Sequence, residues 1–143
     1  MILPDTALLI YAYNEDAPQH QAAREWIEQH FSGSEPLALT WVTLGGFLRV
    51  CTSRRIMERP LRISQAIQII DQWLEQPCIR VIRPGERHWV ILKELLSALD
   101  VGGNLVTDAH LAALAIEHDC ELHSTDADFA RFEGLRWTNP LKH

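Results

Sequence analysis

Three aspartates in this sequence lie where a carboxylate is well placed to do chemistry, at the start of a helix. Asp5 follows the first apolar residues, and Asp126 follows a short predicted strand, Glu121–His123. Asp108 precedes the apolar run Ala109–Ala115 and comes shortly after a glycine-containing loop. Taken singly, each is explained as an ordinary helix-start residue, because a carboxylate there accepts backbone N–H bonds and suits the helix dipole.

As a set, the acids indicate a metal site. The carboxyl ends of parallel strands share one edge of a sheet, so Asp5, Asp108, Asp126 and the nearby Asp128 are expected to converge there. Two carboxylates ~5 Å apart repel by about 3 kcal/mol, which protons or a divalent cation must relieve. Oxygen ligands without His or Cys favour Mg²⁺ or Mn²⁺, and such an ion activates water for attack on a phosphate ester.

Arginines are concentrated in one segment of an otherwise acidic chain. The formal net charge is -6, yet five arginines stand against the single acid Glu58 between positions 49 and 62: Arg49, Arg54, Arg55, Arg59 and Arg62. Alone, this segment reads as a solvated helix end and loop. Beside a metal site, it indicates a polyanionic ligand such as RNA.

The elements that must position these residues alternate between strand and helix. This pattern predicts an α/β domain with a mostly parallel central sheet covered on both faces. Expected strands lie at 2–3, 37–39, 78–82, 121–123 and within 136–140. Expected helices follow Asp5 and cover about 18–31, 64–75, 86–99 and 105–118, and another, capped by Thr40 or Thr43, runs to Cys51. The apolar helix faces are expected to include Ala22, Ile67 and Trp89.

The chain length of 143 residues predicts a single domain over positions 1–143. No apolar run reaches the ~18 residues of a membrane span, and the first residues lack the basic start of a signal peptide. Three widely spaced cysteines, with no C-x-x-C pair, fit reduced thiols in a cytoplasmic protein.

Three segments in this order resemble the PIN-domain ribonucleases, specifically the toxin subunit of VapBC-type toxin–antitoxin pairs. They are "ILPDTALLIYAYNEDAPQHQAAREWI", "FLRVCTSRRIMERPL" and "GNLVTDAHLAALAIEHDCELHSTDADFARFEGLRWTNPL", which together span nearly the whole chain. The resemblance implies an α/β/α sandwich and a Mg²⁺-dependent endoribonuclease that cuts loops of structured RNA. It also implies a homodimer and inhibition by a small VapB-like antitoxin.

Carried over by position, Asp5, Asp108 and Asp126 match the metal-binding acids of the family, and Asp128 matches an auxiliary acid. Thr125 matches a hydroxyl that often accompanies the last acidic turn. Because Arg49 lies three residues after Gly46, it is expected to contact phosphate in the cleft. Arg54 and Arg55 are weaker candidates for RNA contacts at the rim.

One position departs from the family pattern. Family members commonly carry Glu in the helix before "FLR", where this chain has Gly46. Three hypotheses follow: catalysis by the remaining acids with Asp128 compensating, a disarmed toxin, or a PIN module that binds RNA or protein without cutting. The first is preferred, because a decaying site would be expected to lose its other acids too.

Among the remaining residues, His110 is expected to pack against a helix or lie at the surface rather than contact the metal shell. Trp41 is the one tryptophan considered for base stacking, because it lies beside a predicted strand end. A receiver-like phosphoacceptor is disfavoured. Such domains have adjacent acids near the N-terminus and a late lysine, whereas this chain offers only Asp5 in its first strand.

Overall fold

The computed structural model describes residues 1–142 and contains a five-stranded sheet in which every neighbouring pair is parallel. The strand order is β3-β2-β1-β4-β5, with the first strand in the centre. The strands are β1 (Ile2–Pro4), β2 (Leu37–Leu39), β3 (Ile79–Val81), β4 (Glu121–His123) and β5 (Trp137–Thr138). The predicted α/β sandwich with a mostly parallel sheet is confirmed.

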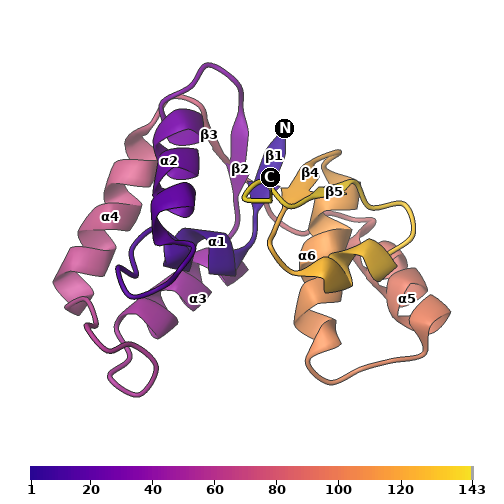
Figure 1. Cartoon of the computed structure of the whole chain (residues 1–143). Helices are drawn as coiled ribbons and strands as arrows, with labels where there is room; N and C mark the ends of the chain where they lie inside the picture. Colours follow the sequence, from indigo (N-terminus) through magenta and orange to yellow (C-terminus); the bar gives the residue numbers. More distant parts are fainter. Residues whose placement is uncertain (143) are drawn as a thin grey trace.

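Helices cover both faces of this sheet, as Figure 1 shows: α1 to α4 lie on one side, and α5 and α6 on the other. A short 3₁₀ segment, η1, follows β4. The helices are α1 (Thr6–Tyr11), α2 (His20–Phe31), α3 (Trp41–Cys51), α4 (Ile63–Glu75), α5 (His88–Leu99) and α6 (Leu105–Glu117), and η1 spans Ala127–Arg131.

Two hydrophobic cores result, one on each face. Within β2, Leu37 and Leu39 pack into the core beneath α1 to α4, whereas Ala38 between them packs toward α5 and α6. This alternation is the period-two geometry of a strand buried on both sides. Helix α6 is buried along most of its length, with Leu111 to Ala115 all inaccessible or nearly so. It therefore fixes Asp108, in its first turn, against the sheet.

Several sequence-based details differ from the structure. Helix α2 begins at His20 rather than Pro18, and its buried alanine is Ala23, not Ala22. The predicted core residue Trp89 is 63% exposed, because α5 turns His88, Ile91 and Leu95 inward instead.

Ile67 of α4 is likewise exposed, at 49%, while Ala66, Ile70 and Trp73 face the core. In both α4 and α5 the apolar stripe is wider than the buried one, so the apolar pattern alone does not fix which residue faces the sheet.

All three cysteines, Cys51, Cys78 and Cys120, are buried free thiols. Within residues 1–142, no helix combines the length and the apolar character needed to cross a membrane.

Candidate active site

Asp5 lies at the carboxyl end of the central strand, where it caps α1. Its Oδ1 accepts a hydrogen bond from the Thr6 amide at 2.7 Å, and its own amide donates to the His123 carbonyl at 2.9 Å. Burial raises the pKa of the Asp5 carboxyl, hydrogen bonds from Ser124 and Thr6 oppose that rise, and the charge of Asp126 adds to it. The sheet thus holds a carboxylate in a partly desolvated position.

Ser124 is the residue that joins the first acid to the last acidic turn. Its side chain is completely buried, and its hydroxyl donates to Asp5 Oδ2 at 2.8 Å while accepting from the Asp126 amide at 3.0 Å. The hydroxyl of this turn that contacts the acids therefore comes from Ser124, one position before the predicted Thr125. The pairing of β1 with β4 accounts for this contact. Pro4 pairs with His123, so the next residues of the two strands, Asp5 and Ser124, lie side by side.

Asp126 and Asp128 lie at the start of η1. Asp126 caps this segment, and its Oδ1 accepts from the Asp128 amide at 2.9 Å. Both residues are exposed. The backbone bond orients the Asp126 carboxylate, as a helix-start residue does, and leaves its second oxygen available.

Asp108 lies in the first turn of α6, half-buried. The pKa of its carboxyl is raised to about 6, chiefly by burial and then by the negative charges of Asp5, Asp126 and Asp128. The charges of the other three predicted acids therefore act on Asp108.

A cleft of about 480 Å³ opens beside these acids, between α1, α3 and α6. Arg49 lines it from α3, so the predicted position of this arginine near the acids is met. Its lining residues are Asp5, Thr6, Ala7, Ile10, Val42, Gly46, Arg49, Thr107 and Asp108.

Gly46 faces α1 so closely that a side chain there meets Thr6. A Cβ added at Gly46 would lie 2.8 Å from the Thr6 Cγ2 atom and 3.4 Å from its hydroxyl oxygen. Real Cβ atoms do not approach that closely. The space that a side chain at position 46 would need is here filled by the Thr6 side chain of α1.

The donor set fits a hard divalent cation. The acids offer oxygen ligands only, and Mg²⁺ typically uses one or two carboxylates and completes its shell with water. Among the described residues, no three His, Cys, Asp or Glu side chains are close enough to surround an ion by themselves. Asp5 and Asp108, which line the same cleft, are the pair best placed to hold such an ion.

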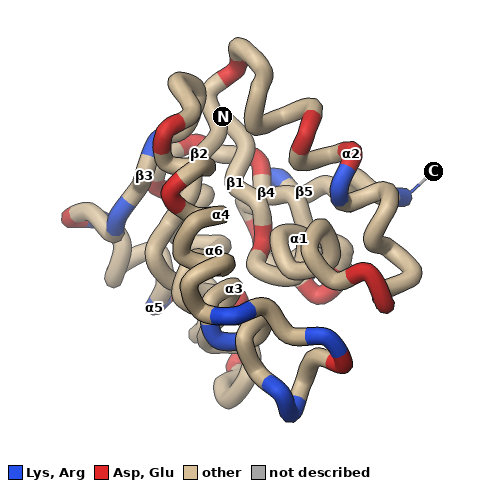
Figure 2. The backbone as a smooth tube through the Cα atoms, turned by 90° about the vertical axis from the view of Figure 1, so that its left-hand side faces the viewer, with Lys and Arg blue, Asp and Glu red and all other residues tan. Residues whose placement is uncertain are grey.

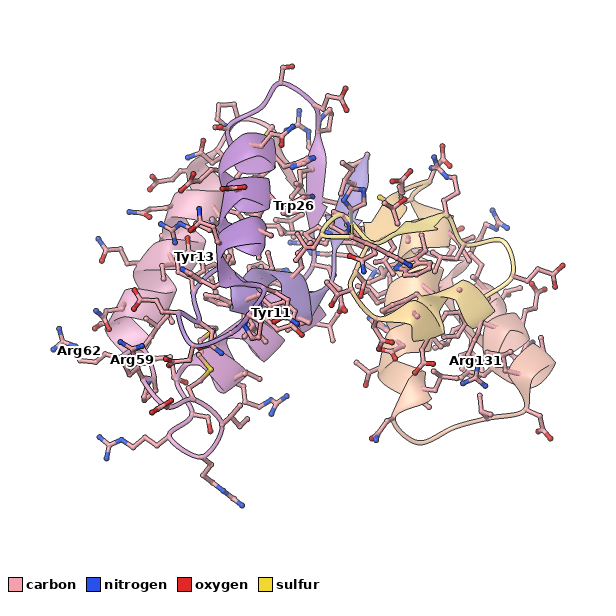
Figure 3. All side chains as sticks on the ribbon, viewed as in Figure 1. Tyr11, Tyr13, Trp26, Arg59, Arg62 and Arg131 are labelled. Carbon is pink, nitrogen blue, oxygen red and sulfur yellow. The ribbon has the colours of Figure 1, made fainter. Side chains whose placement is uncertain are left out.

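The arginine-rich segment is arranged around and after α3, and Figure 2 shows basic positions gathered there. Arg54 and Arg55 are exposed, as a contact at the rim requires. Arg59 is instead paired with Asp16 at 2.6 Å, and it also lies 3.6 Å from Glu15. Figure 3 shows Arg59 and Arg62 together at the outer edge, near the start of α4.

His110 packs against α5, as expected from the sequence. Its Nδ1 lies 3.0 Å from His88 Nε2, and the two rings meet edge to face. Burial, followed by the neighbouring His88, lowers the pKa of His110. This histidine therefore links the two helices of one layer.

A second histidine, His123, connects β4 to α2 next to Asp5. Its Nδ1 accepts from Trp26 Nε1 at 3.2 Å, so its Nε2 carries the proton and donates to Glu121 at 2.9 Å. Trp26, labelled in Figure 3, reaches the sheet from α2. This network, which the sequence did not reveal, ties α2 to the strand whose carbonyl holds Asp5.

Comparison with known proteins places this architecture in a family. Residues 2–135 match the model of the PIN domain. Ribonuclease VapC33 of Mycobacterium tuberculosis is 44% identical over 142 residues, covering 99% of both chains. VapC ribonuclease Mb2897 of Mycobacterium bovis is 41% identical over 141 residues, covering 99% of this chain and 96% of that one.

Solved structures share the fold. VapBC-1 from nontypeable Haemophilus influenzae superposes with a TM-score of 0.71 at 20% identity, covering 99% of this chain and 100% of that one. Mycobacterium tuberculosis VapC20, described as a sarcin-ricin loop cleaving toxin, gives a TM-score of 0.67 at 18% identity, covering 95% and 99%. By the family model and the full-length relatives, this chain belongs to the PIN-domain family, among the VapC proteins.

Proposed function

We propose that the chain is a divalent-metal-dependent endoribonuclease, the toxin of a VapBC-type pair, acting as one PIN domain over residues 1–143. The observation that carries the proposal is the cleft lined by Asp5, Asp108 and Arg49, with the charges of Asp126 and Asp128 acting on Asp108. Full-length relatives named as ribonucleases support it. The substrate class is structured RNA, such as loops of tRNA or rRNA.

In this mechanism, Asp5 and Asp108 would hold Mg²⁺ or Mn²⁺ in the cleft, Asp126 would be the third metal-binding acid, and Asp128 would add negative charge beside them. With such an ion bound, the site would gain an activated water and a positive charge to neutralise phosphate. Arg49, which lines the same cleft from α3, binds a phosphate of the RNA backbone. Ser124 fixes the Asp5 carboxylate by a 2.8 Å hydrogen bond, so that its orientation is set before the substrate arrives.

The experiment is cleavage of a mixed tRNA and rRNA pool by the purified chain in EDTA, Mg²⁺ or Mn²⁺. We expect metal-dependent fragments from the parent chain and none from Asp5→Asn or Asp108→Asn. Degradation by both variants at the parental rate would refute the catalytic assignment.

Gly46 favours a second candidate, a PIN module that binds RNA or protein without cutting. This candidate predicts RNA retention with no turnover in either metal. Gly46→Glu separates the two: cleavage by this variant alone would identify a disarmed toxin, and cleavage by the parent chain would show that no acid is needed there.

The partners proposed with this function are a VapB-like antitoxin and a second copy of the chain. Structural neighbours include toxin–antitoxin complexes, such as the one from Klebsiella pneumoniae, with a TM-score of 0.64. Co-expression with the protein encoded beside this gene, followed by size-exclusion chromatography with light scattering, measures both partners in one experiment.

A further inference from the structure

An uncharged hydroxyl lies beside the first acid of the cleft. Thr6 is the first residue of α1, and it lines the cleft together with Asp5 and Asp108. Its amide donates to Asp5 Oδ1 at 2.7 Å, but its hydroxyl makes no hydrogen bond to another residue within positions 1–142. This hydroxyl is therefore available to a water molecule or a ligand in the cleft.

The Thr6 side chain is held in place by α3, which packs against α1 (Figure 1). Its methyl carbon lies so close to Gly46 that a Cβ added to that glycine would be 2.8 Å from it. Because the methyl group and the hydroxyl share one stiff Cβ, the contact that fixes the first also fixes the direction of the second. Glycine costs a helix about 1 kcal/mol relative to alanine, and the contact with Thr6 accounts for that cost at Gly46.

The acids of the cleft leave most of the shell of a bound Mg²⁺ to water. Among the described residues, no three His, Cys, Asp or Glu side chains could surround an ion, and Mg²⁺ readily keeps several waters. Both oxygens of Asp5 already accept hydrogen bonds, from the Thr6 amide and the Ser124 hydroxyl. A water beside Asp5 therefore needs a further partner.

The Thr6 hydroxyl suits this role because a hydroxyl both accepts and donates hydrogen bonds. Thr107 also lines the cleft, but its side chain is exposed, whereas Thr6 is half-buried and held against Gly46. Removing an outer partner of a metal site typically weakens metal binding by about 10–100-fold. An effect of this size is readily measured.

We propose that Thr6 is a positioning residue of the metal site, whose hydroxyl hydrogen-bonds a water in the shell of the divalent cation beside Asp5. This inference rests on the metal dependence of the proposed function. It adds an uncharged residue to the acids of the site, and it gives Gly46 an indirect part, as the surface against which Thr6 is set.

The test measures Mg²⁺ affinity from the rise in melting temperature with increasing Mg²⁺, a readout that needs no cleavage of RNA. Thr6→Val keeps the methyl group against Gly46 and removes the hydroxyl, so Mg²⁺ should bind about 10–100-fold more weakly. Thr6→Ser keeps the hydroxyl and should bind Mg²⁺ more tightly than Thr6→Val. Thr52→Val is the matched control and should keep the parental affinity, because the Thr52 hydroxyl donates to the Leu48 carbonyl at 2.6 Å, outside the cleft.

The two adjacent glycines of α3 provide a second test that leaves every polar group of the cleft in place. In Gly46→Ala the new methyl group displaces the Thr6 side chain, so Mg²⁺ affinity should fall. In Gly45→Ala it meets nothing within 4 Å, and the affinity should stay at the parental value. Both exchanges gain the helix preference of alanine, and the melting temperature in EDTA reports any cost of the contact. Adding Thr6→Ser to Gly46→Ala removes the contacted methyl carbon and should restore part of the affinity.

Parental Mg²⁺ affinity in Thr6→Val would overturn the inference, as would a melting temperature of the parent that responds to neither Mg²⁺ nor Mn²⁺. Equal losses in Thr6→Val and Thr6→Ser would assign Thr6 to packing alone and also overturn it. Failure of the ribonuclease proposal gives a different pattern, in which the parent cuts no RNA while its Mg²⁺ binding still depends on the Thr6 hydroxyl, and that result supports the inference.

Discussion

The raised pKa of Asp108 makes a prediction about stability that distinguishes a metal ligand from an ordinary helix-start residue. In the folded chain without metal, the carboxyl titrates at about 6 instead of 3.8. Between these values the folded state holds more protons than the unfolded state, so the stability of the metal-free protein falls as the pH rises through this window. Above about pH 6 the Asp108 carboxyl is ionised in the folded state, and its ionisation lowers the free energy of unfolding by the full amount.

The size of that cost follows from the shift. A difference from 3.8 to about 6 corresponds to about 3 kcal/mol if the group were fully shielded. Since Asp108 is only half-buried, solvent screening reduces it to about 1.5 kcal/mol. Asp108→Asn also removes a favourable interaction with the α6 dipole, worth about 0.5 kcal/mol. The net expectation is that Asp108→Asn stabilises the metal-free protein by about 1 kcal/mol near neutral pH.

The assay is urea unfolding of the parent and of Asp108→Asn in EDTA, at about pH 7.5 and about pH 4.5. The gain should also appear as a rise in melting temperature of about 3 °C at the higher pH, and it should shrink toward zero at the lower pH. Adding Mg²⁺ should stabilise the parent and leave the variant unchanged. A variant less stable than the parent in EDTA at the higher pH would refute the reasoning and identify Asp108 as a helix-start residue only.

Three further predictions concern neighbouring residues. Ser124→Ala removes a fully buried hydroxyl and leaves Asp5 Oδ2 and the Asp126 amide without it, so the free energy of unfolding should fall by about 1–3 kcal/mol in urea titrations. Gly46→Glu should lose about 1–3 kcal/mol through its contact with Thr6, and adding Thr6→Ala should restore part of that stability. Arg49→Gln should slow RNA cleavage, whereas Arg59→Gln, which loses an ion pair with an exposed acid, should cut at the parental rate.

The parts of the fold that depend on short-range pattern were predictable from the sequence. The strand at Leu37–Leu39 is continuous and apolar, and Glu121–His123 lies between a long helix and an acidic turn, so both were placed at their observed bounds. Their parallel pairing follows from the alternation with helices. The convergence of Asp5, Asp108 and Asp126 follows in turn from that pairing.

The parts that depend on long-range packing were not predictable. Arg59 joined a group of five arginines in the sequence, but it pairs with Asp16, which lies 43 positions earlier. Trp89 has apolar neighbours at helical spacing, yet the orientation of α5 is set by residues that face the sheet. Thr125 was named from the family pattern alone, whereas Ser124 follows from the strand register, which the sequence did not supply.

The position of β1 at the centre of the sheet has a consequence for the timing of synthesis. Asp5 precedes Asp108, Ser124 and Asp126 by more than 100 positions in the chain. Until β4 has been synthesised, β1 has no neighbour on one side, and the first acid has neither its hydroxyl partner nor its companion acids. A ribosome making this protein therefore carries a chain without its assembled acids until β4 and the acidic turn after it have been added.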